Sequence, residues 1–169
     1  MMKVNFLAQE HRKEPVKQDP LLGICDPDGE LPAYTTTERG ADKWCAEIQN
    51  NEKKRFQFIA VDKNIDIRKP DGSQESRCDG MIFVAETNEL SFVELKDYHV
   101  GGYISDAEDQ LKKTLEYFLA NRHYEDFNNR RAFACNPRRP YFAFSARQRI
   151  REFYNLTHFR LLPQAKIVL

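Results

Sequence analysis

Two acidic residues and one lysine in the middle of the chain have the types and spacing of a site for a divalent cation. Asp79 precedes a short apolar run, and Glu94 and Lys96 stand two residues apart in a second run. Because side chains along a strand alternate between its faces, Glu94 and Lys96 leave the same face. Carboxylates supply the oxygen ligands that Mg²⁺ prefers, and a bound cation lowers the pKa of its water. Lys96 cannot ligate the cation, so we expect it beside the metal, acting on the water or on developing negative charge.

A hairpin between the two runs would bring these groups together. The runs flank a polar segment with the composition of a turn. A two-residue turn at Thr87-Asn88 predicts that Asp79 lies opposite Lys96 and diagonal to Glu94, within reach of a shared ligand. A slip of one residue would move one partner to the other face.

The elements around this hairpin predict a mixed α/β fold. A capping box at Thr35 and Glu38 predicts a first helix, and Ser105 with Glu108 predicts a second one. The apolar stripe of the first helix would be formed by Ala41, Trp44, Cys45 and Ile48. In chain order we expect a helix over 35–50, strands over 56–61, 78–84 and 90–96, a helix over 105–121 and a strand over 131–135.

The two ends of the chain differ from this central part. Residues 1–34 are polar and contain four prolines, which predicts an irregular N-terminal arm. Residues 35–169 are expected to form a single domain whose C-terminal part is rich in arginine. In that part a helix over 146–155 is expected, with weaker strand candidates over 141–145, 159–162 and 167–169.

Asp79, the hairpin and Glu94-Leu95-Lys96 together resemble the PD-(D/E)xK nuclease superfamily over about 100 residues. The resemblance implies a restriction-endonuclease-like αβββαβ core, in which a central mixed β-sheet is flanked by helices. It implies Mg²⁺ or Mn²⁺ as cofactor, with Asp79 and Glu94 as metal ligands and Lys96 as a catalytic residue. The chain departs from the superfamily pattern in having Cys78 where a proline often precedes the acid.

The resemblance also suggests further site residues. An acid in the first helix often completes the metal site, and Glu47 is the best match, with Glu38 second. A glutamine early in the helix after the lysine is matched by Gln110, which would orient the lysine, the water or the phosphate. The RecB-like branch has a tyrosine four residues later, where this chain has Thr114.

Charge is distributed unevenly along a chain whose formal net charge is zero. Residues 121–169 carry ten Lys or Arg against three acids, so the remainder is negative. Aromatic residues are interleaved with these arginines, as in surfaces that contact nucleic-acid phosphates. A solvated basic face, or a patch for an acidic protein, is the alternative reading. The candidates for contacts with nucleic acid, expected to be DNA, are Arg130, Arg131, Arg138, Arg139 and Arg147.

Composition and spacing exclude several other classes. The four cysteines and four histidines are scattered, without the spacing of a zinc site or a redox motif. No apolar stretch is long enough to span a bilayer, and the N-terminus lacks the features of a secretory signal. We therefore expect a cytoplasmic location and no membrane partner.

The sequence therefore predicts a metal-dependent endo- or exodeoxyribonuclease, of the kind found in defence, repair or a mobile element. The chain would act as a homodimer or within a larger complex, because many such nucleases cut two strands as dimers. The alternative is a nuclease-fold subunit that no longer cuts and serves as a binding or assembly protein. A chance Glu-x-Lys in an unrelated α/β domain is a third reading.

Overall fold

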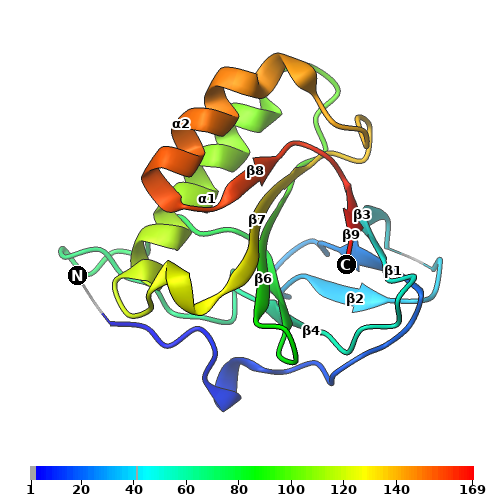
Figure 1. Ribbon diagram of the computed structural model, residues 1–169, viewed down its shortest axis with the longest axis horizontal. Coiled ribbons are helices and arrows are strands. Elements are labelled where there is room, and N and C mark those ends of the chain that lie inside the picture. The colour runs from blue at the N-terminus through cyan, green and yellow to red at the C-terminus, as the bar shows by residue number, and fades with distance from the viewer. Residues whose placement is uncertain (1–2, 41) are drawn as a thin grey trace.

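A mixed five-stranded sheet is the centre of the computed structural model, which describes residues 3–40 and 42–169 (Figure 1). Its strands β4, β5 and β6 are antiparallel neighbours, whereas β6, β7 and β8 run parallel. The bounds of these strands are Gln57–Ala60 for β4, Gly80–Val84 for β5, Glu89–Leu95 for β6, Asn128–Cys135 for β7 and Arg160–Leu162 for β8. The expected α/β class is therefore confirmed.

Two helices cover one face of this sheet (Figure 1). Helix α1 (Tyr103–Leu119) connects β6 to β7, and α2 (Arg147–Thr157) connects β7 to β8. Parallel neighbours need such crossovers, because a tight turn can join only antiparallel strands. Apolar residues of both helices, among them Leu111 and Phe153, pack with Phe92 of β6 in one buried cluster. No helix within the described residues is long and apolar enough to cross a membrane.

A second sheet covers the opposite face. Its order is β2-β1-β3-β9, with β9 parallel to β3 and the other pairs antiparallel. Ile24, Ile48 and Ile167 of this sheet pack with Val93 and Phe133 of the central sheet in a second buried cluster. The bounds are Leu21–Cys25 for β1, Tyr34–Thr36 for β2, Trp44–Gln49 for β3 and Lys166–Val168 for β9. The molecule thus has three layers: helices, sheet, sheet.

The prediction of a helix over 35–50 is wrong, because strands β2 and β3 lie there. In β3 the buried residues Ala46 and Ile48 alternate with the partly exposed Glu47 and Gln49, which is the two-residue period of a strand. Thr35 does not cap a helix, since its side chain is hydrogen-bonded to Glu14 and Lys17. Ala41, assigned to the same apolar stripe, lies outside the described residues.

Three smaller expectations also differ from the structure. The N-terminal segment predicted to be irregular contains β1 and a 3₁₀ helix over Gln9–His11. Residues 141–145 are not a strand but lead into a 3₁₀ helix over Phe144–Ala146. Helix α1 begins two residues before Ser105, after Gly102 in the left-handed conformation, so the expected capping box is not formed. Another short 3₁₀ helix, Tyr124–Asp126, precedes β7.

Candidate functional site

Asp79, Glu94 and Lys96 meet on the helix-covered face of the central sheet. The β5–β6 register pairs Val84 with Glu89 and Gly80 with Val93, so the next step brings Asp79 beside Glu94. The connection is longer than the expected two-residue turn, and the predicted register is wrong by two residues. A shift of two keeps every side chain on its face, and it places the two carboxylates directly opposite instead of diagonal.

Main-chain and glycine geometry fix the position of Asp79. Its Oδ2 accepts a hydrogen bond from the Leu95 N–H at 2.7 Å, which ties the start of β5 to the end of β6. The next residue, Gly80, lies against the ring of Phe58, and a Cβ there would stand 2.3 Å from a ring carbon. Only glycine therefore allows β4 and β5 to approach this closely beside the site.

Lys96 is held between a carboxylate and an amide. Its Nζ lies 2.7 Å from Glu94 Oε1 and donates to Gln110 Oε1 on α1. The Gln110 amide in turn donates to the carbonyl of Arg77 at 3.1 Å. Gln110 therefore connects the lysine to the segment that carries Asp79, as a positioning residue would.

Thr114, one turn further along α1, supports the same segment. Its hydroxyl accepts from the Cys78 N–H at 2.7 Å and donates to the Gln110 carbonyl at 2.9 Å. The position at which the RecB-like branch has a tyrosine is thus occupied by a residue that fixes the backbone next to Asp79. Cys78 itself is fully buried, and burial raises the pKa of its thiol.

Burial dominates the electrostatics of the site. It raises the pKa of Asp79 to about 7, against the effect of the Leu95 N–H. The pKa of Glu94 is raised by burial and by the nearby charge of Asp79, while Lys96 opposes both effects. For Lys96, burial lowers the pKa, but attraction to Glu94 more than offsets this and the net shift is upward. Two buried acids side by side resist ionising together, and a cation bound between them would favour their charged forms.

One carboxylate oxygen of Glu94 has no hydrogen-bond partner among the described residues. Glu94 is 2 % exposed, and its Oε2 makes no hydrogen bond, although Oε1 is paired with Lys96. A buried carboxylate oxygen without a donor is costly. Within residues 3–40 and 42–169 no group of three or more His, Cys, Asp or Glu could hold a metal ion. Mg²⁺ keeps several waters and needs only one or two carboxylates, so Asp79 and Glu94 fit it.

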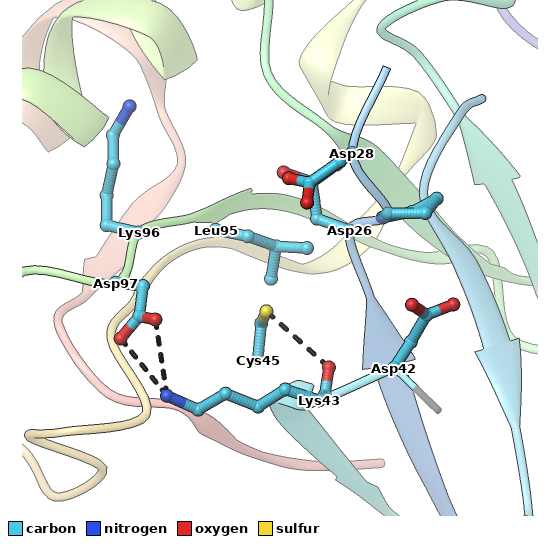
Figure 2. A pocket seen from close by; sticks show the side chains of 9 residues that line it. Asp26, Asp28, Asp42, Lys43, Cys45, Leu95, Lys96 and Asp97 are labelled. Carbon is cyan, nitrogen blue, oxygen red and sulfur yellow. Dashed lines mark hydrogen bonds and ion pairs between the residues drawn. The ribbon is translucent and has the colours of Figure 1, made fainter. Parts of the chain in front are cut away.

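A cleft of about 420 Å³ opens beside Lys96 (Figure 2). In Figure 2 the carboxylates of Asp26 and Asp28 lie on one side of Leu95, and the side chain of Lys96 lies on the other side and does not point toward them. Asp26 directly follows β1, and partial burial raises its pKa, which the charge of Lys96 lowers. The sequence signal for Asp26 was an acid just after a buried apolar run, but Asp26-Pro27-Asp28-Gly29 reads more strongly as a turn.

Glu47, the expected third metal ligand, lies elsewhere. It is on β3 of the second sheet, and its neighbours Ala46 and Ile48 point into the core between the sheets. Glu47 therefore points to the outer surface, where its carboxylate lies 3.7 Å from Arg39. Glu38, the second choice, is exposed near β3, and its carbonyl accepts from the Trp44 indole. Neither acid lines the cleft beside Lys96, and of the three residues at the predicted site only Lys96 does, since Asp79 and Glu94 are not among its lining residues.

The five candidate arginines do not form one surface. Arg138 and Arg139 follow β7 at the end of the sheet that carries Lys96, and Arg138 is paired with Asp97 at 2.6 Å. Arg147 is exposed at the start of α2. Arg130 and Arg131 lie near the start of β7, at the opposite end of the parallel pair formed by β6 and β7.

No protein-family model, curated protein or solved structure matches this chain. The residues of the site are therefore the only indication of its function.

Proposed function

We propose that this chain hydrolyses phosphodiester bonds of DNA with the help of Mg²⁺ or Mn²⁺. The observation that carries the proposal is the buried Glu94, whose Oε1 is paired with Lys96 and whose Oε2 has no hydrogen-bond partner among the residues that the structure describes. Asp79 provides a second carboxylate across the strand pair. Two acids that could hold a divalent cation, with an amine beside them, are suited to the hydrolysis of a phosphodiester bond.

Each residue would have a separate role. Asp79 and Glu94 would hold the cation, which supplies a water of lowered pKa and offsets charge on a phosphoryl oxygen. Lys96 would orient the attacking water or stabilise negative charge that develops on the phosphate. Gln110 would keep the lysine aligned through its own bond to the Arg77 carbonyl. Asp26 is close enough to Asp79 for its charge to raise the pKa of that carboxyl, so it is a better candidate for a third acid than Glu47, which is paired with Arg39.

The topology supports the same proposal. Three antiparallel strands, a helix and a parallel strand follow one another as β4, β5, β6, α1 and β7. The resemblance to the PD-(D/E)xK superfamily implies the same order of elements after the first helix of its core. The second sheet stands where that helix was expected, and it brings Asp26 to the site from β1.

Cleavage of plasmid and of labelled single- and double-stranded oligonucleotides with Mg²⁺ or Mn²⁺ tests the proposal. We expect the parent to cut and Lys96→Ala and Asp79→Ala to lose at least about 100-fold in rate, since each removes a group acting in the transition state. Lys113→Ala, an exposed lysine on the same α1, is the matched control and should cut normally. Gln110→Ala should slow cleavage less than Lys96→Ala.

Calorimetric titration with Mn²⁺ separates the possible failures. Binding by the parent and not by Asp79→Ala would support the metal site even before a substrate is found. A parent that neither cuts any substrate nor binds the cation would overturn the proposal and favour the alternative, a binding or assembly subunit.

A further inference from the structure

A second cleft lies at the other end of β7 from Lys96. It has a volume of about 520 Å³, within the range of small-molecule sites. Its lining residues come from the segment after α1, the start of β7, the end of α2 and the start of β8. We call it the distal cleft and define it by six of its lining residues: Tyr124, Arg130, Arg131, Tyr154, His158 and Arg160.

Aromatic rings are already stacked in the distal cleft. The rings of Tyr124 and His158 are nearly parallel, with centroids 3.8 Å apart, and the Arg130 guanidinium lies 4.9 Å from the Tyr124 centroid. Tyr154 meets His158 edge-on at 6.1 Å and is 46 % exposed. Beside the stacked pair there is therefore a partly exposed tyrosine ring on which a further planar group could stack.

The charge of the distal cleft favours an anion. Three arginines face a single acid, Glu125, among its lining residues. None of the ion pairs of the described residues involves these arginines. Arg130 and Arg131 are fixed by bonds to neutral groups, the carbonyls of Tyr124 and Val168 and the Ser91 hydroxyl, whereas Arg160 is exposed. Guanidinium groups held in this way are suited to phosphate oxygens.

We propose that the distal cleft binds a nucleotide unit of a single-stranded nucleic acid. The base would stack on the accessible ring of Tyr154, and the phosphate would be bound by Arg130 and Arg160. Single-strand binding proteins combine aromatic platforms with a positive groove in this way. The proposal goes beyond cleavage and does not depend on it, because the cleft contains none of the residues placed in the hydrolytic site.

Fluorescence anisotropy with a labelled single-stranded 12-mer, in chelator so that no cleavage occurs, tests the distal cleft. We expect Tyr154→Ala and Arg160→Glu each to weaken binding by about tenfold, as expected for one lost base stack or one lost phosphate contact. Tyr154→Phe keeps the ring and should bind within about twofold of the parent. Arg151→Glu makes the same charge change at an exposed position of α2 that does not line the cleft, and is the matched control.

Competition experiments identify the recognised group. Unlabelled oligonucleotide should displace the probe at lower concentration than a mononucleotide, and a mononucleotide at lower concentration than inorganic phosphate. If the mononucleotide competes as well as the oligonucleotide, the distal cleft binds free nucleotides, and the proposal of a single-stranded nucleic acid is wrong. Equal weakening by Arg151→Glu and Arg160→Glu, or equal competition by polyglutamate, would show a nonspecific positive surface and overturn it. Binding that persists in a parent unable to cut would leave this inference standing while the proposed hydrolysis fails.

Discussion

Asp79 couples the protonation of the site to the stability of the fold. Its pKa is about 7 in the folded chain, against an ordinary value of 3.8, because burial disfavours its charged form. The folded state therefore binds this proton more tightly than the unfolded state, and the stability it contributes is lost as pH rises from about 4 through 7. Asp79→Asn removes the ionisation, so without metal the variant should gain stability over the parent as pH rises.

Thermal unfolding in chelator at pH 5 and pH 8 measures this effect. The interval from pH 5 to pH 8 covers about two pH units below the pKa of Asp79, each of which corresponds to about 1.4 kcal/mol, and Asp79 is partly exposed, so we expect a relative gain of about 2 kcal/mol. That is about 4–8 °C in Tm for a chain of this size. Asp109→Asn, at an exposed position of α1, should show no such gain. An Asp79→Asn variant that follows the parent at both pH values would contradict the assignment.

At the scale of elements, local pattern predicted the strands of the central sheet but, of the second sheet, only β9. The strands around Asp79 and Glu94 have apolar runs bounded by turn residues, and α1 has a long apolar face, so each is recognisable from its neighbours in sequence. Residues 44–49 contain apolar side chains at both helical and strand spacing. Pairing with β1 and β9 decides between them, and those partners lie about 20 and 120 residues away, which a local pattern does not include.

Gly23 and Trp44 test the β1–β3 contact that replaced the expected helix. A Cβ on Gly23 would stand 2.0 Å from the Trp44 indole, so Gly23→Ala should destabilise the fold by about 2 kcal/mol through overpacking. Trp44→Ala removes the ring, and in that background the same glycine change should cost much less. Urea unfolding of the four proteins in this double-mutant cycle gives the coupling. Gly101→Ala, which has open space, is the control, and a Gly23→Ala variant as stable as the parent would contradict the contact.

At the scale of the whole molecule, the candidate site combines residues that only tertiary packing brings together. Asp79 and Glu94 come from one hairpin, Gln110 from the crossover helix and Asp26 from the second sheet. The hairpin pair was predictable because its separation in sequence is short. Asp26 was not, because its approach depends on how the two sheets stack. The arginines of the C-terminal third, adjacent in sequence, are likewise divided by β7 between two ends of the molecule.

This division predicts how binding depends on the length of a strand. The eight residues of β7 span about 26 Å, which corresponds to about eight nucleotides at 3.4 Å per step. Affinity for oligothymidines of 4 to 16 residues, measured in chelator, should therefore rise steeply until about eight residues and then level off, because a longer strand reaches both Arg138 and the distal cleft. Arg160→Glu should weaken binding of the longer oligomers most. Arg138→Glu should weaken binding of every oligomer that contacts the end of β7 near Lys96. If Arg160→Glu lowers affinity by the same factor at every length, one strand does not bridge the two ends.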